Sequence, residues 1–201
     1  DVRDPNLLDS VKEVREAAER CARIVKTFLA MARQQTPERK SAQLNDIINS
    51  ALKLIDYSLR TASIEVILEL QADLPEISAD TDQINQVFAN LFVNAQQALL
   101  ECPEPRQLTI RTRYDEVANQ LCVEVSDNGP GIPEIVRSRI FDPFFTTKPM
   151  GAGTGVGLSL SHGIITAHGG TLNYQDSAQG GACFVIHLPI HVPELGTHHL
   201  S

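Results

Sequence analysis

Apolar residues recur in steps of four and three from Leu7 to Ala32, which is the a/d spacing of a helical seam. The pattern predicts an amphipathic helix that begins near Pro5 and stops in the polar, proline-containing residues 34–39. One interpretation is a helix packed on its own domain, and the other is a helix of a dimeric bundle. The length of the seam and its separation from the remaining pattern favour the bundle.

The remainder of the chain alternates between helical and strand-like periods and predicts an α+β domain. Amphipathic helices are expected at residues 44–59, 81–100 and about 155–167. Strands are expected at residues 64–70, 108–113, 121–125, 171–174 and 183–188. Residues 126–153 are expected to form a loop region. No apolar run reaches the roughly 20 residues of a membrane span.

The composition is that of an ordinary globular protein of one or two domains, with 201 residues, 42% of them hydrophobic, and a mean hydropathy of −0.11. The formal net charge of −8 and the isoelectric point of about 5.2 disfavour nucleic-acid binding but leave nucleotide binding open. The first residues do not resemble a signal peptide, and the four cysteines lie apart without metal-type spacing. We therefore expect a cytoplasmic protein with small, buried cysteines.

Four polar or glycine-rich signatures follow one another after residue 89. They are Asn90–Ala95, Asp127–Gly131, Phe141–Phe145 and Gly151–Leu158. Each alone is weak, because glycine and asparagine are common in turns and helix caps. Together they predict an ATP site with amides for a metal, a carboxylate for the base, a hinged lid and a glycine cradle for phosphates.

Asn90 and Asn94 are four residues apart on a predicted helix, so both amides point from the same face. An asparagine oxygen is a neutral, hard ligand that suits a magnesium ion otherwise held by phosphates and water. The alternative is that both residues lie on a solvated face. The apolar frame of Val87, Leu91, Ala95 and Ala98 favours a face fixed on a core-packed helix.

Asp127 follows a predicted strand and precedes Gly129 and Gly131. A carboxylate only accepts hydrogen bonds, so it can bind the exocyclic amine of adenine, while the glycines let the backbone approach the ring. The alternative is an ordinary turn after a strand, because Asp-Asn-Gly-Pro-Gly is strong turn sequence.

Phe141, Phe144 and Phe145 lie in a loop that is otherwise rich in polar residues. Loop phenylalanines need a place to dock. A hinged segment that closes over a ligand would supply one, and Lys148 could then reach a phosphate. The alternative is a loop that is permanently pinned to the core.

The glycines of the last signature run directly into a predicted apolar helix. Such a turn presents backbone N–H groups and the positive end of the helix dipole, which together favour anion binding. The Walker pattern does not fit, because no Gly-Lys-Ser/Thr follows. The dinucleotide fingerprint does not fit either, because the spacing and the preceding strand differ.

In this order, the four signatures resemble the N, G1, F and G2 boxes of the catalytic ATP-binding domain of bacterial sensor histidine kinases. The resemblance covers about residues 40–190. The seam helix resembles the second helix of the preceding dimerisation and phosphotransfer domain, and the Phe-Phe-Thr-Thr-Lys string resembles the nitrogen-regulatory and C4-dicarboxylate sensor subgroup. The implied domains are a partial bundle at residues 1–36, a linker at 37–41, the catalytic domain at 42–190 and a tail at 191–201.

The fold implied by the resemblance is an N-terminal bundle helix followed by a two-layer α/β sandwich, the histidine-kinase and gyrase-type ATPase fold. It has a mixed sheet of about five strands with three helices on one face, and residues 133–152 form the lid. Asn94 would bind Mg²⁺, Asn90 would support the metal and phosphates, and these two with Lys148 form the implied catalytic set. The implied ATP-binding residues are Asn90, Asn94, Asp127, Gly129, Gly131, Ile132, Phe145, Thr147, Lys148, Gly153, Thr154, Gly155, Val156, Gly157 and Leu158.

The sequence departs from the family pattern at several places. The phosphoacceptor histidine belongs upstream of residue 7, so the chain that begins at Asp1 is expected to be a fragment without it. Every histidine present follows the nucleotide signatures, and we expect His162 and His168 to cap or pack at the two ends of one helix. Gln97 stands where many relatives have a lysine or arginine that meets phosphate, and Ala182 where a threonine is frequent.

Gyrase-type and chaperone ATPases place a glutamate base where this chain has Asn90, which cannot take a proton. The resemblance therefore implies slow hydrolysis and transfer of the γ-phosphate of Mg-ATP to a histidine on the dimerisation bundle. Expected partners are ATP, the histidine-bearing bundle helix, a response-regulator receiver domain and a second copy bound through the N-terminal helix, with no nucleic acid and no direct membrane contact. A membrane anchor elsewhere in the full-length protein is left open. The alternatives are a module that binds ATP without phosphoryl transfer, and a chaperone-like or topoisomerase-like ATPase, which Asn90 disfavours.

Overall fold

The computed structural model describes residues 38–148 and 153–190. These residues fall into two compact units, a main unit of residues 38–133 and 161–190 and a loop unit of residues 134–160 without 149–152. The predicted seam helix and the tail lie outside the described residues, as do Gly151 and Ala152 of the last signature.

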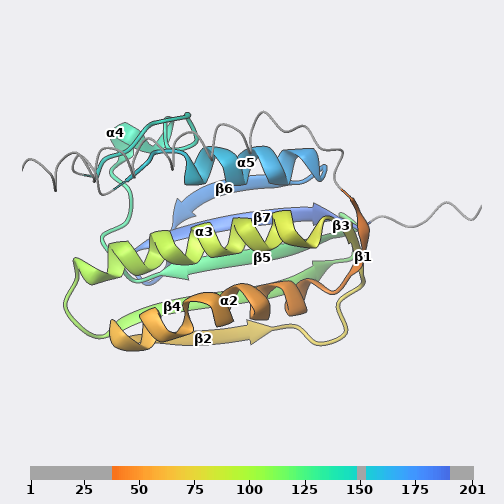
Figure 1. The fold of residues 1–201 in the computed structure, drawn as a ribbon, viewed down its shortest axis with the longest axis horizontal. Helices are drawn as coiled ribbons and strands as arrows, with labels where there is room; N and C mark the ends of the chain where they lie inside the picture. The colour runs from red at the N-terminus through yellow and green to blue at the C-terminus, as the bar shows by residue number, and fades with distance from the viewer. Residues whose placement is uncertain (1–37, 149–152, 191–201) are drawn as a thin grey trace, which may run out of the picture. The chain divides into compact units, whose positions relative to one another are not determined.

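A five-stranded sheet forms the base of the main unit (Figure 1). Its spatial order is β2 (Ile64–Leu70), β4 (Arg106–Asp115), β5 (Gln120–Asp127), β7 (Ala182–Pro189) and β6 (Thr171–Asp176). The β2–β4 pair is parallel and the other pairs are antiparallel. The predicted mixed sheet of about five strands is thereby confirmed.

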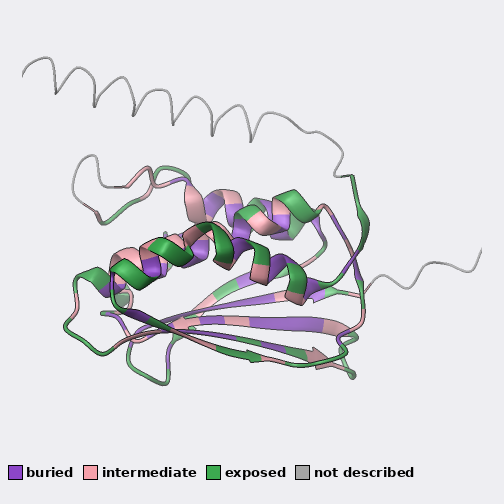
Figure 2. Ribbon diagram, turned by 60° about the horizontal axis from the view of Figure 1, so that its bottom comes forward, coloured by how far each residue is buried: buried purple, intermediate pink, exposed green. Residues whose placement is uncertain are grey.

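Helices cover one face of this sheet (Figure 1). They are α2 (Leu44–Thr61), α3 (Thr81–Leu100) and, from residue 161 onward, α5 (Gly157–Ala167). On α2 the buried residues Leu44, Ile47, Ile48 and Ala51 follow the helical period. Figure 2 shows buried positions concentrated where helices and sheet face each other, so the core of the main unit lies between these two layers.

Three short elements were not predicted from the sequence. Strand β1 (Lys40–Ala42) pairs antiparallel with β3 (Ile77–Ala79) in a separate two-stranded sheet, and α4 (Glu134–Arg137) lies in the loop unit. The prediction of continuous loop over residues 126–153 is wrong at α4 and at residues 126–127, which end strand β5. Elements of three or four residues are too short to show a periodic pattern.

The N-terminus of α3 is fixed by two polar contacts. The N-cap residue Asp80 accepts a hydrogen bond at Oδ1 from the Gln83 amide (3.1 Å), and its own amide donates to Nε2 of His168 (3.0 Å). His168 is 4% exposed, and its Nδ1 donates to the Ile164 carbonyl (2.8 Å). The predicted packing of His168 at the end of the last helix is confirmed, whereas His162 is exposed.

The cysteines of the described chain are free thiols. Cys122 and Cys183 are buried, as predicted, and Cys102 is half-buried. Desolvation by burial raises the pKa of both buried thiols. Among the described residues, none of the helices combines the length and apolar character that a bilayer crossing requires.

Candidate functional site

Helix α3 presents Asn90 and Asn94 from one face. Both side chains are half-buried, and Val87 and Leu91 on the adjoining face of the helix are buried, so the core fixes the direction of the amides. Asn90 Nδ2 donates a long hydrogen bond (3.4 Å) to Oγ of Ser161, a fully buried residue of α5. The predicted core-packed frame of the two asparagines is confirmed at Val87, Leu91 and Ala95, which are buried, whereas Ala98 is half-buried.

Asp127 is the last residue of β5 and is 4% exposed. Its Oδ1 accepts two backbone hydrogen bonds, from Gly129 (2.9 Å) and from Ala182 (3.1 Å). Desolvation raises the pKa of this carboxyl, and the two amides oppose that change by stabilising the charged form. Because both donors reach the same oxygen, the carboxylate has one fixed orientation.

The turn before β7 completes this arrangement, and its role was not predicted from the sequence. A Cβ on Gly181 would lie 2.3 Å from the Asp127 carbonyl oxygen, 2.4 Å from Oδ1 and 2.5 Å from the Gly129 amide. No side chain fits there, so glycine is required for the close approach of the two backbones. The adjacent glycines of the Gly180–Gly181 pair were the only sequence signal for this contact.

Two groups of predicted residues meet in the main unit. A Cβ on Gly129 would lie 3.6 Å from the Cβ of Ala98, which is one helical turn beyond Asn94. Asn90, Asn94 and Ala98 therefore form a continuous stripe on α3, with Ser161 at one end and the Asp127–Gly129 loop at the other. We call this the α3 stripe.

The end of the Asp127 loop lies against the last strands of the sheet. Gly131 has a φ of +69°, and its Cβ would lie 3.5 Å from the Gly181 carbonyl oxygen. The Ile132 amide donates to Oη of Tyr174 on β6 (3.2 Å). The main unit thus joins Gly129, Gly131 and Ile132 to the carboxylate and to the turn before β7.

The loop unit contains the predicted phenylalanines and lysine. The Arg139 guanidinium carbon lies 4.5 Å from the centre of the half-buried Phe145 ring, while Phe144 is 57% exposed. The Lys148 amide donates to Thr146 Oγ1 (3.2 Å), and a Cβ on Gly153 would lie 3.3 Å from Cδ of Lys148. Lys148 and Gly153 are therefore neighbours within this unit.

The second part of the loop unit leads into α5. Gly155 has a φ of +65°, and its Cβ would lie 2.4 Å from the carbonyl carbon of Phe144, so the glycine is required here also. Gly157 is the first residue of α5, which confirms that the glycine signature leads into a helix. The remaining predicted residues of this unit differ in exposure: Thr147 is exposed, Thr154 and Leu158 are half-buried, and Val156 is buried.

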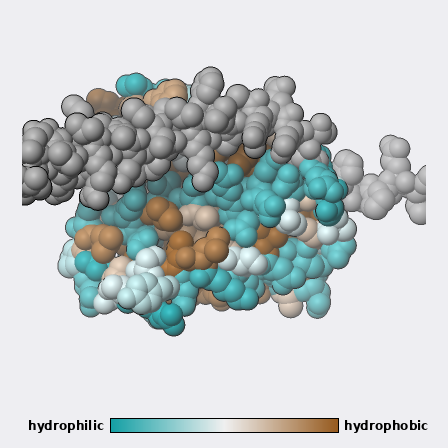
Figure 3. Space-filling view, in the orientation of Figure 1, coloured by the Kyte–Doolittle hydropathy of each residue, from teal (hydrophilic) through white to brown (hydrophobic). Residues whose placement is uncertain are grey.

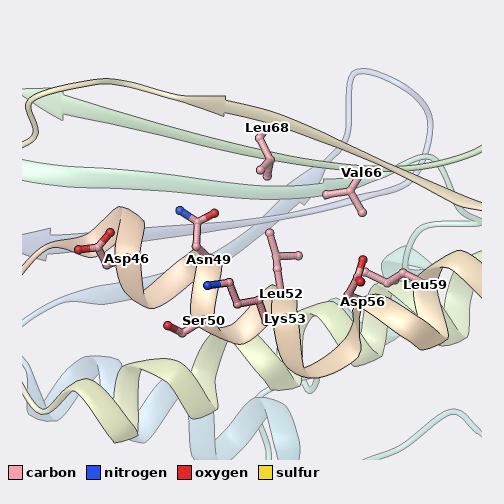
Figure 4. A pocket seen from close by; sticks show the side chains of 9 residues that line it. All are labelled: Asp46, Asn49, Ser50, Leu52, Lys53, Asp56, Leu59, Val66 and Leu68. Carbon is pink, nitrogen blue, oxygen red and sulfur yellow. The ribbon is translucent and has the colours of Figure 1, made fainter.

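A separate groove of about 600 Å³ lies between α2 and β2. Leu52 points toward Val66 and Leu68, and acidic Asp46 and Asp56 lie along the helix side (Figure 4). None of the predicted site residues lines this groove. The same face shows hydrophobic residues grouped within a hydrophilic surface (Figure 3). Leu54, Tyr57 and Leu68 are exposed large side chains of α2 and β2.

Comparison with known proteins identifies the family. Residues 79–192, more than half of the chain, match the model of the histidine kinase-, DNA gyrase B- and HSP90-like ATPases. The chain therefore belongs to this family. It is 38% identical over 200 residues to the sensor kinase CckA of Brucella abortus and 32% identical over 175 residues to the sensor histidine kinase ZraS of Escherichia coli K12. These alignments cover 92% and 87% of this chain but only 20% and 36% of the relatives, so the chain spans a minor part of their length.

Solved structures agree with this assignment. The nucleotide-free catalytic domain of histidine kinase ThkA matches with a TM-score of 0.67 and 32% identity, over 76% of this chain and 95% of that domain. ThkA in complex with the response regulator TrrA matches with a TM-score of 0.75 and 28% identity, over 94% of this chain and 53% of that one. The resemblance to the catalytic domain of sensor histidine kinases is thus confirmed, and family membership supports an ATP-binding function.

Proposed function

We propose that this chain is the catalytic portion of a sensor histidine kinase, which transfers the γ-phosphate of Mg-ATP to a histidine on the dimerisation bundle. A response-regulator aspartate would then receive the phosphate, as the complex of ThkA with its regulator suggests for a relative. The full-length protein would act as a homodimer through its bundle, with ATP use in the cytoplasm. The observation that carries the proposal is the α3 stripe, because it joins the two asparagines to the loop of Asp127.

The adenine base would bind at Asp127. Its Oδ1 is occupied by the amides of Gly129 and Ala182, so Oδ2 is the atom that would accept the exocyclic amine. Gly129, Gly131 and Ile132 would line the base, and the Gly181 turn would hold the carboxylate in place. A buried carboxylate with a fixed orientation selects an amine and rejects a carbonyl oxygen at the same position.

Magnesium would be held by Asn94, with support from Asn90. Within the described ranges, no cluster of three or more His, Cys, Asp or Glu side chains could hold a metal. A magnesium ion that is bound mainly by phosphates and water does not need such a cluster, so one or two amide oxygens fit it. When bound, the ion neutralises charge on the phosphates.

The loop unit contains the residues that the family resemblance assigns to phosphate binding. Lys148 beside Gly153 offers an ammonium group, and residues 153–158 offer backbone amides at the start of α5. The transferred group would be attacked by a neutral imidazole nitrogen of the supplied histidine while its bond to the ADP oxygen breaks. Asn90 does not accept a proton from water, so positioning of the histidine, rather than activation of water, would decide the reaction.

The test is to mix the chain with Mg-ATP and a supplied histidine-bearing bundle, and to measure acid-labile phosphate on the bundle. We expect transfer that is lost in Asn94→Ala and retained in Asn49→Ala, a half-buried helical asparagine of the α2 groove that serves as the matched control. ATP binding without transfer would favour a module that only binds nucleotide. Rapid ATP hydrolysis without the bundle would favour a gyrase-like or chaperone-like ATPase.

A further inference from the structure

The loop that follows Asp127 is held at both ends by side chains. At its start the Gly129 amide donates to Asp127, and at its end the Ile132 amide donates to Oη of Tyr174 (3.2 Å). Asp127 and Tyr174 are distant in sequence and lie on different strands, β5 and β6. The backbone between these two anchor points is the part of the chain that would line the adenine base.

Tyr174 is itself fixed in place. Its hydroxyl donates to Oδ1 of Asp176 on the same strand (2.9 Å), so the phenol oxygen keeps its lone pairs for the Ile132 amide. Its ring packs edge-on against Phe184, the residue directly opposite on β7, with centroids 5.8 Å apart. The hydroxyl position is thus determined by the sheet and by Asp176, not by the loop that it holds.

We infer that Tyr174, supported by Asp176, is a positioning residue for the base pocket, an inference that rests on the proposed ATP binding. The Tyr174 hydroxyl fixes the end of the Asp127 loop, and so sets the distance between the loop backbone and the carboxylate that would accept the adenine amine.

Tyr174→Phe tests this role with little other change, because it keeps the ring against Phe184 and removes only the hydroxyl. Tyr114→Phe is the matched control, since the Tyr114 hydroxyl also donates a hydrogen bond, to Asn119 (3.0 Å), but Tyr114 lies opposite Leu121, at the other end of β5 from Asp127. The first measurement is amide hydrogen exchange by NMR on the 201-residue chain without nucleotide. We expect the Ile132 amide to exchange faster in Tyr174→Phe and at the wild-type rate in Tyr114→Phe.

The second measurement is calorimetric titration with Mg-ATP and Mg-ADP. Loss of one hydrogen bond that orders the loop is expected to weaken both ligands by the same factor, roughly three- to tenfold, because the base is common to both. Tyr114→Phe should leave both affinities unchanged. A general loosening of the fold would instead lower the thermal midpoint of Tyr174→Phe well below that of the control.

The outcomes separate this inference from the proposed function. Unchanged exchange at Ile132 would overturn the anchor itself, and faster exchange with unchanged affinity would overturn its role in the base pocket. Failure of the wild-type chain to bind Mg-ATP would contradict the proposed function and remove the nucleotide role of Tyr174. The exchange measurement would still decide in that case whether Tyr174 orders the loop.

Discussion

Replacing Asp127 with asparagine should reverse the base preference of the proposed site without unfolding the chain. An asparagine oxygen can still accept the amides of Gly129 and Ala182, which reach Oδ1 at 2.9 and 3.1 Å. The second oxygen then becomes an NH₂ group that faces the adenine amine, so a donor meets a donor. Inosine triphosphate carries an oxygen at that position of the base and can accept from the new amide.

The magnitude follows from the burial of this residue, which is 4% exposed. A buried polar group left without a partner costs about 1–3 kcal/mol, which corresponds to a roughly 5- to 150-fold weaker affinity for ATP. The preference between ATP and inosine triphosphate should therefore shift by at least this factor. Calorimetric titration of both nucleotides with the wild-type and variant chains measures it directly.

Asn128→Asp is the control for this experiment, because it makes the reverse exchange, of a side-chain amide for a carboxylate, at the neighbouring residue. Asn128 accepts from the Gln107 amide (2.7 Å) and donates to the Pro105 carbonyl (2.8 Å), so its change should lower stability but keep the preference for ATP. Unchanged ATP affinity in Asp127→Asn would contradict recognition of the adenine amine by Asp127. An equal loss of ATP and inosine triphosphate binding in both variants would contradict it as well.

The Asp127→Asn substitution should also change how the free energy of unfolding depends on pH. Burial raises the pKa of Asp127 in the folded chain above its unfolded value of about 3.9. The folded state then binds the proton more tightly, so this group lowers the free energy of unfolding as pH rises from the unfolded pKa through the folded pKa. Urea titrations should show Asp127→Asn gaining stability relative to the wild type across that window. A relative loss with rising pH would contradict the assignment.

Three further substitutions test the fold around the site, each by urea unfolding. Gly181→Ala places a Cβ 2.3 Å from the Asp127 carbonyl oxygen. It should lower the free energy of unfolding by about 1–3 kcal/mol and weaken ATP binding. An unchanged free energy of unfolding and an unchanged ATP affinity would contradict the close approach of the two backbones. Asp80→Ala removes the N-cap of α3 and should cost about 1 kcal/mol, and a loss below about 0.3 kcal/mol would contradict the cap. Thr109 Oγ1 is buried without a hydrogen-bond partner among the described residues. Thr109→Val should therefore be neutral or stabilise the chain by about 1 kcal/mol. A clear loss of stability would show that this hydroxyl does make a hydrogen bond.

The periodicity of apolar residues predicted the helices and strands that have one buried face and one exposed face. On α3 the repeat of Val87, Leu91 and Ala95 fixed both the helix and the direction of the asparagines, since a helix in a core has one possible orientation. The sequence order of the four signatures predicted the family, which the comparisons confirmed. The roles of the individual site residues remain proposals.

The features that the sequence did not predict depend on which strands pair and in what register. Ser126 lies opposite Cys183 in the β5–β7 ladder, and this register brings Asp127 to the Ala182 amide and requires glycine at position 181. Alternation within a strand does not reveal its neighbour, so neither this contact nor the one between Ile132 and Tyr174 could be predicted. The three-residue strands β1 and β3 were missed because their pairing, not their composition, defines them.

The α3 stripe and the Asp127 loop are proposed to bind one Mg-nucleotide. Replacing Mg²⁺ with paramagnetic Mn²⁺ in the presence of ATP, and recording NMR line broadening along the chain, shows which residues lie near the bound ion. We predict that the side-chain amide of Asn94 broadens most strongly, that Asn90 and Gly129 follow, and that the effect requires ATP. Broadening that spares α3, or that centres on the groove between α2 and β2, would contradict the claim.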